Sequence, residues 1–311
     1  MEFVMGGAAA MGACLFTNPL EVLKTRLQLQ GELKEKGSHA VHYKNVFHAG
    51  YVVAKNDGVW ALQKGLGPAL VVQLLLNGAR LGCYGVADTY GYLRDKDGHM
   101  MFTQSVIITG CGAVLGQYLS SPFFLVKTHL QSQAVQNIAV GHQHNHQNSL
   151  QALINIYKEN GVKGLFRGAL ASVPRAFIGG STQLISFDYA KKLIESYDVT
   201  NNALLKSFLG SMVGGIAISF AMTPFDLILT RLYNQPTDAK GKGVLYTSYM
   251  DCVTKIYKSE GLLAFYKGIG PMYLRLGPHT VLCLMFWDHL RILYNKYVVQ
   301  EQTSKNENTL A

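Results

Sequence analysis

The chain contains one phrase three times, about a hundred residues apart. Each copy starts at a proline and runs for ten residues, over 19–28, 122–131 and 224–233. A second phrase follows each copy and ends at a glycine, 46, 46 and 44 residues after the proline. These glycines are Gly65, Gly168 and Gly268. Two linked phrases that recur in order at a fixed spacing indicate three copies of one structural unit.

Each unit has two apolar windows of about twenty residues, the length that crosses a bilayer as a helix. Several windows contain a charge or a proline near the middle, which keeps the mean hydropathy of the whole chain at only +0.12. Helices that face a water-filled cavity have such residues, whereas helices surrounded by lipid do not. The sequence therefore predicts an all-α membrane protein with spans at 3–29, 66–92, 104–131, 169–190, 203–233 and 269–292.

The repeats divide the chain into three parts of one membrane domain, followed by a polar tail. We assign the repeats to 1–98, 99–199 and 200–297, and we expect the tail, 298–311, to be disordered. Between the two spans of each repeat we expect an amphipathic surface helix, at 43–55, 149–158 and 249–258.

The first phrase combines a helix-bending residue with charge. Proline inside a helix removes a backbone donor and crowds the preceding turn, so we expect kinks at Pro19, Pro122 and Pro224. Glu21 and Lys24 then share a helix face just beyond the kink. They could form an ordinary pair within one helix, but the triplication favours pairing between repeats around a pseudo-threefold axis.

The second phrase ends in an aromatic residue, a base and the glycine that opens the next span. Free N–H groups at that helix start could hold an anion such as a lipid phosphate. Plain capping of a helix end is an equally good interpretation of the same residues.

A net charge of +9 raises the question of a polyanionic partner. No Lys/Arg stripe with interleaved aromatic residues lies outside the spans, which argues against nucleic acid. The three long loops between paired spans contain more Lys and Arg than the two short loops do. The positive-inside rule then places the long loops together in the inner compartment and both termini on the opposite side.

The two phrases resemble the signature of the mitochondrial carrier family, solute carrier family 25, over almost the whole chain. Within the family, the sequence resembles the subgroup that contains the oxaloacetate carrier and members 34 and 35. The resemblance implies a pseudo-threefold barrel of six transmembrane helices with three short matrix helices. It also implies a monomer of the inner mitochondrial membrane that moves one substrate at a time by alternating access, with cardiolipin as a bound lipid.

In this family, an acid of one odd-numbered helix pairs with a base of the next to close the matrix side. Carried over, Glu21 pairs with Lys127, and Asp226 pairs with Lys24. The resemblance further implies that each pair is braced from below by the residue two positions after the last base of the phrase. These brace positions are Gln28, Gln131 and Tyr233.

The third matrix pair has no charged residues in this chain, because Phe124 and Leu229 occupy its two positions. Both partners are missing together, so we expect an apolar contact in place of the ion pair. A single missing partner would instead leave a costly unpaired charge in the closed gate.

On the cytosolic side the family has an aromatic-acid-x-x-base phrase on its even-numbered helices. Two copies match, with Asp188 and Lys191 in the second repeat and Asp288 and Arg291 in the third. The first copy departs from the pattern, because it has Gly85 and Asp88. We expect Asp188 and Arg291 to form the one regular pair of a weak outer gate.

Three arginines lie near mid-membrane, where a charge is expensive. They are Arg80, Arg175 and Arg275. Each could be neutralised by a protein acid or reach an interface, but no acid lies within a turn of Arg175 or Arg275 in its own span. We therefore expect them to bind an anion, and the family's contact points coincide with these three residues and Ala176. Weaker lining candidates are Gln183, His279, Gln117 and Cys14, with plain packing an equal interpretation for His279.

Two or three guanidinium groups suit a small dianion, since each can engage carboxylate or sulfate oxygens bidentately. The sequence thus predicts an antiporter of dicarboxylates, oxoacids or sulfur oxoanions such as sulfate and thiosulfate. An uncoupler-like proton or anion leak carrier is the nearest alternative, and a membrane adaptor without transport is a more distant one. No nucleophile–base set, phosphate loop or metal quartet suggests an enzyme, and we expect no cofactor.

One further motif is the histidine tract His142-x-His144-x-His146. It lies in a polar loop rich in Asn and Gln, so we interpret it as solvated and expect no metal there.

Overall fold

The computed structural model describes residues 2–34, 41–93, 101–197, 202–238, 241–294 and 296. Helices dominate these residues, which contain no β-strand. The long helices are α1 (Glu2–Leu29), α3 (Leu66–Thr89), α4 (Phe102–Leu119) with α5 (Ser121–Ser132), α7 (Ser172–Ser196), α8 (Ala203–Asn234) and α10 (Ile269–Tyr294). The shorter ones are α2 (Val46–Asn56), α6 (Ser149–Leu165) and α9 (Tyr249–Glu260), with 3-10 turns at Val59–Gln63, Gln136–Ile138 and Leu262–Tyr266.

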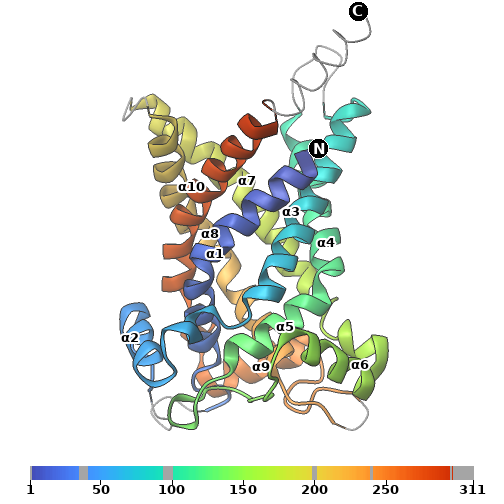
Figure 1. The fold of residues 1–311 in the computed structure, drawn as a ribbon, viewed down its shortest axis with the longest axis vertical. Coiled ribbons are helices and arrows are strands. Elements are labelled where there is room, and N and C mark those ends of the chain that lie inside the picture. Colours follow the sequence, from blue (N-terminus) through green and yellow to red (C-terminus); the bar gives the residue numbers. More distant parts are fainter. Residues whose placement is uncertain are drawn as a thin grey trace, which may run out of the picture.

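The long helices form a closed ring. Each one packs against the next in the order α1, α3, α4, α7, α8, α10 and back to α1, with α5 continuing α4. The helices α2, α6 and α9 gather at one end of this ring, and α1 begins at the other end (Figure 1). The ring encloses a central axis toward which the ends of α1, α5 and α8 converge.

All six predicted spans coincide with long helical segments, but the prediction of six membrane-crossing helices is not confirmed. Among the described residues, two stretches are long and apolar enough to cross a membrane, Val59–Thr89 and Leu205–Asn234. The bent pair formed by α4 and α5 raises the number to three. Charged and polar residues inside the remaining helices lower their hydropathy. Apolar side chains such as Phe16, Ile216 and Phe220 are exposed, at 64%, 52% and 57%.

The three prolines act differently. The second repeat breaks at Ser120, just before Pro122, and its two helical segments meet at an angle of 66°. Pro19 and Pro224 instead lie inside α1 and α8, which continue through them. The predicted kink is therefore confirmed at Pro122, which Ser120 and Ser121 precede, and stays a prediction at Pro19 and Pro224.

Each short helix begins at a polar cap. The side chains of Asn45, Asn148 and Ser248 accept hydrogen bonds from the backbone N–H three residues later, which satisfies a donor that the first helical turn leaves free. The buried face of each helix packs beneath the ring, through residues such as Val53 in α2 and Ile256 in α9. The predicted surface helices thus form, and α6 is interrupted by a kink at Gly161, whose φ of 63° is not helical.

Candidate functional site

Two buried ion pairs join the converging ends of α1, α5 and α8. Lys24 Nζ lies 2.8 Å from Asp226 Oδ2, and Lys127 Nζ lies 2.5 Å from Glu21 Oε2. All four side chains are less than a tenth exposed. Each pair links two different repeats, as the family resemblance implies.

The same two acids also hold arginines from the even-numbered helices. Arg175 Nε lies 2.6 Å from Asp226 Oδ1, and Arg275 Nη1 lies 2.7 Å from Glu21 Oε1. The inference that no protein acid neutralises these arginines is therefore wrong, because the acids come from other helices. Each acid has one oxygen on a lysine and the other on an arginine. We call these six residues the ion-pair cluster: Glu21, Lys24, Lys127, Arg175, Asp226 and Arg275.

The ion-pair cluster is not electrically neutral. Among the described side chains that meet here, four bases face two acids, which leaves two positive charges uncompensated. Charge removed from water is expensive unless a counter-charge accompanies it. The cluster is therefore complementary to an anion that carries two negative charges.

Two buried hydrogen-bond donors at the ion-pair cluster are also available, one on Gln117 and one on Arg275 itself. Gln117, fully buried in α4, accepts a 2.9 Å hydrogen bond from Arg175 Nη1 through its Oε1. Within the described part of the chain, neither Gln117 Nε2 nor Arg275 Nε has a hydrogen-bond partner. Buried donors of this kind are normally satisfied, so both can serve an anion's oxygen atoms.

The three brace positions have three different roles. Gln28 donates to Asp226 Oδ2 over 3.0 Å and so supports a cluster acid directly. Gln131 instead bonds Thr25 and Asn18 of α1, and the Tyr233 hydroxyl lies 3.0 Å from Ser121 Oγ.

The converging ends of α1, α5 and α8 meet in three pairs, and we call each of these contacts a seam. The α5–α8 seam has aromatic and apolar contacts where the α1–α5 and α8–α1 seams have ion pairs. Phe124 and Leu229 are both buried and belong to one apolar cluster that includes Tyr233. The rings of Phe124 and Tyr233 lie 5.4 Å apart. Lys127 Nζ and Arg175 Cζ lie 5.1 Å and 5.3 Å from the centroid of the Phe124 ring, within the range of cation–π attraction.

On the side of the ion-pair cluster away from α2, α6 and α9, helices of the ring line a half-open cavity of ≈ 420 Å³. Arg80 and Gln183 line it and share a 2.9 Å hydrogen bond from Arg80 Nη1 to Gln183 Oε1. His279 does not line this cavity, and its Nδ1 lies 3.1 Å from Thr17 Oγ1. Ala176 and Cys14 are buried.

The base before each helix-opening glycine bonds to backbone carbonyls at the end of the neighbouring repeat's odd-numbered helix. Lys64 Nζ donates to Gln133 O, Lys267 Nζ donates to Gln30 O, and Arg167 Nη2 donates to Tyr233 O and Gln235 O. These bonds satisfy carbonyls that a helix end leaves free. The bases of this phrase therefore cap helix ends. These helix ends belong to a neighbouring repeat, which the sequence alone did not reveal.

The glycines after these bases contact the brace positions. Gly168 has φ +78°, and a Cβ there would lie 2.9 Å from Tyr233 Cε1. The equivalent Cβ atoms at Gly65 and Gly268 would lie 3.0 Å from Gln131 Cγ and 2.9 Å from Gln28 Cγ. Glycine is therefore required both by the backbone and by the close approach of the next helix.

The predicted outer gate lies partly outside the described residues. The side chains of Asp188 and Lys191 are not described, while Asp288 and Arg291 belong to α10. The Asp188–Arg291 pair stays a prediction. The predicted tail, 298–311, also lies outside the described residues.

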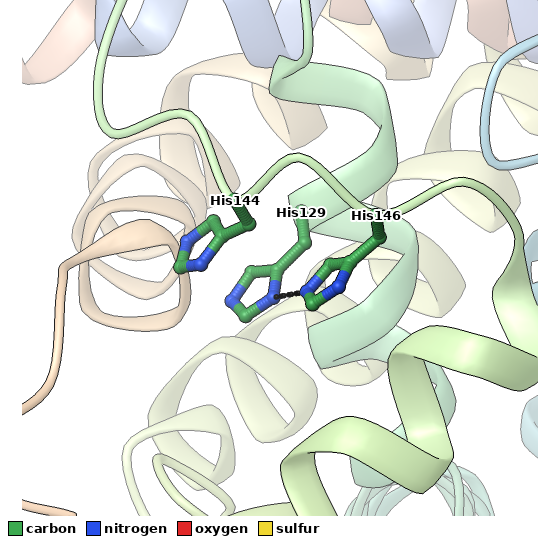
Figure 2. Close-up of side chains that lie close together, drawn as sticks. All are labelled: His129, His144 and His146. Atoms are coloured by element: carbon green, nitrogen blue, oxygen red, sulfur yellow. Dashed lines mark hydrogen bonds between the residues drawn. The ribbon is translucent and has the colours of Figure 1, made fainter.

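The histidine tract is not fully solvated, contrary to our interpretation. His142 is exposed, but His144 and His146 are half-buried, and both stack with His129, a buried residue of α5, and with each other (Figure 2). Burial lowers the pKa of His144 to about 3 and also lowers that of His146. These rings are therefore neutral at neutral pH.

Comparison with known proteins agrees with this architecture. The sequence model of the family described as Mitochondrial carrier protein matches residues 1–92, 98–198 and 200–298. Solute carrier family 25 member 35 of Homo sapiens is 51% identical over 94% of this chain and 98% of its own. The Mitochondrial oxaloacetate transport protein of Schizosaccharomyces pombe is 41% identical over 95% and 91%. Mitochondrial citrate transporter E of Aspergillus niger is 38% identical over 91% and 89%.

The chain belongs to the mitochondrial carrier family. It is therefore a solute carrier of the inner mitochondrial membrane rather than an enzyme.

Proposed function

We propose that this carrier exchanges small dianions, namely dicarboxylates, oxoacids or sulfur oxoanions, by alternating access. The observation that carries the proposal is the excess of two positive charges in the ion-pair cluster. A relative named as an oxaloacetate transporter supports the choice of dicarboxylates.

The geometry supports a route for the anion from the cavity to the ion-pair cluster. In the cavity it meets Arg80 and Gln183. At the ion-pair cluster, the oxygen atoms of the anion compete with the carboxylates of Asp226 and Glu21. They compete for the guanidinium groups of Arg175 and Arg275, because a guanidinium group can bind the oxygens of either partner.

Competition for the arginines links binding to opening. When Arg175 turns to the substrate, Asp226 retains only Lys24 and Gln28, and Glu21 likewise retains only Lys127 when Arg275 turns. The contacts that close this end of the ring then weaken while substrate is bound. Departure of the substrate allows the arginines to return to the acids.

The dianion preference follows from charge. A monoanion leaves one buried positive charge uncompensated, and a trianion leaves one negative charge in excess. Each charge-assisted hydrogen bond contributes about 1.5–3 kcal/mol. An anion that cannot form two of these bonds therefore binds to the carrier well over tenfold more weakly.

We further propose that the long loops face the matrix and both termini face the intermembrane space, and that the protein functions as a monomer. Binding of cardiolipin phosphate at the helix starts near Gly65, Gly168 and Gly268 stays a prediction. The free N–H groups of those starts support it.

A reconstituted exchange assay tests the proposal. Purified protein in liposomes would be offered a competition panel of dicarboxylates, oxoacids, sulfate, thiosulfate, phosphate and nucleotides, with and without internal counter-substrate. We expect small dianions to compete best and uptake to require counter-substrate. Uptake without counter-substrate would favour a leak carrier, and competition by nucleotides alone would contradict the proposed substrate class.

A further inference from the structure

The second repeat lacks a buried ion pair that the other two repeats contain. Arg26 Nη1 lies 2.7 Å from Asp57 Oδ2, and Arg231 Nη1 lies 2.5 Å from Glu260 Oε1, in each case joining the end of an odd-numbered helix to the glycine turn after the surface helix. The corresponding residues of the second repeat are His129 and Asn160. The second repeat therefore has neither the arginine nor the acid at these positions, and the histidine tract packs against His129.

His129 retains one contact of the arginines that it replaces. Arg26 Nε and Arg231 Nε donate to the carbonyl oxygen of the next repeat's brace residue, over 3.3 Å and 3.2 Å. His129 Nε2 lies 2.8 Å from the equivalent carbonyl, that of Tyr233. A carbonyl oxygen only accepts, so Nε2 carries the proton and Nδ1 of the neutral ring presents its lone pair.

His144 is oriented in the same way. Its Nε2 lies 3.0 Å from the carbonyl oxygen of Asn234, which again places the proton on Nε2 and leaves Nδ1 as a lone-pair donor. Histidines that bind metals usually donate their other N–H to a carbonyl or carboxylate, which fixes the tautomer and the ring direction. Two of the three rings therefore already have the support that a metal ligand requires.

The nitrogen atoms are also close enough together. One ring nitrogen from each of His129, His144 and His146 lies within 4.8 Å of the others. His129 Nδ1 is 3.4 Å from His146 Nε2 (Figure 2). Nitrogens bound at about 2.0–2.1 Å to one tetrahedral zinc ion stand about 3.4 Å apart. Because the three rings stack face to face, within 13° of parallel, they must turn out of the stack to direct their lone pairs at one ion.

We propose that His129, His144 and His146 form a binding site for a divalent transition metal of the Zn²⁺ class. Three imidazoles suit zinc and copper better than magnesium or calcium, which prefer oxygen ligands. The pocket of ≈ 40 Å³ at this place is also lined by Glu159, whose carboxylate can offset the charge of the ion. The fourth coordination position takes water or this carboxylate.

Occupation of the site would hold one seam of the ring. His129 belongs to α5, His144 and His146 to the following loop, and the supporting carbonyls of Tyr233 and Asn234 to the end of α8. This α5–α8 seam is the one that has Phe124 and Leu229 in place of an ion pair. The metal would thus reinforce the seam that lacks charge.

Metal binding can be measured on full-length, tag-free protein in detergent after treatment with a chelator. Titration calorimetry with Zn²⁺ should give one ion per chain, and Zn²⁺ should raise the melting temperature. His144→Ala or His146→Ala should weaken binding at least about tenfold. His142→Ala is the matched control, since it changes an exposed histidine of the same tract and should bind Zn²⁺ like the wild type.

A rebuilt variant separates binding from folding. His129→Arg combined with Asn160→Asp restores the ion pair of the other repeats and should fold normally but lose Zn²⁺ binding. Failure of the wild-type protein to bind Zn²⁺ would overturn the proposal and leave the histidines as a neutral packing stack. Equal binding by the wild type and the His146→Ala or rebuilt variants would overturn it as well.

The effect on the seam rests on the proposed function and needs its own readout. In proteoliposomes, Zn²⁺ on the side of the histidine loop should slow exchange by the wild type and by His142→Ala, but not by His146→Ala. Unchanged exchange at a Zn²⁺ concentration that saturates the calorimetric site would contradict the seam-holding role. Absence of any exchange would refute the proposed function while the binding result still stands.

Discussion

The three seams of the ring use the same backbone contacts but different side-chain chemistry. The α1–α5 and α8–α1 seams each contain a buried lysine–acid pair, whereas the α5–α8 seam contains Phe124, Leu229 and Tyr233. At all three seams, however, a side chain donates to the brace residue's carbonyl, from Arg26, His129 or Arg231. This backbone contact of the repeat is therefore present whether or not the seam has a lysine–acid pair.

The charged and apolar seams should differ most in the free energy of unfolding that is lost when one side chain is replaced. Asp226→Asn leaves Lys24 and Arg175 buried without an acid, which should destabilise the protein by about 3–5 kcal/mol. Leu229→Ile on the same helix keeps volume and polarity and should cost less than about 1.5 kcal/mol. Thermal unfolding in detergent compares them, and equal losses would mean that the ion pairs add nothing beyond packing.

A double-mutant cycle tests whether the apolar seam can be converted into a charged one. Phe124→Asp would place an acid near Lys127 and Arg175, which lie over the Phe124 ring, so its cost should be moderate. Leu229→Arg adds a base to a cluster that already has excess positive charge and should be the more harmful single change.

The double change should recover stability, with a coupling of about 0.5–3 kcal/mol if the two side chains meet. Melting temperatures of both single variants and the double variant, with exchange measured alongside, provide the cycle. Strictly additive losses would show that positions 124 and 229 do not face each other across the seam.

Local patterns in the sequence predicted most of the fold. The repeated phrases located the long helices and the surface helices, because apolar periodicity, prolines and glycine turns act within a few residues. The lysine–acid pairs followed only after the resemblance supplied the way in which the repeats face one another.

Contacts between distant parts of the chain could not be predicted in this way. Arg275 meets Glu21, which is 254 residues earlier in the sequence, so a search for acids within the same span could not find it. His129 was not among the predicted site residues, because it occupies an arginine position of the repeat. Only folding brings the 142–146 tract against it.

The central claim is that Arg175 and Arg275 hold the transported dianion in exchange for their acids. Counter-substrate-driven uptake by Arg175→Ala and Arg275→Ala in proteoliposomes tests it most directly, with Lys258→Ala as a control that removes an exposed positive charge elsewhere. Both acids retain their lysines in these variants, so the proteins should fold. We predict that exchange is lost in both arginine variants and unchanged in the control. Uptake near the wild-type rate by either arginine variant would contradict the account.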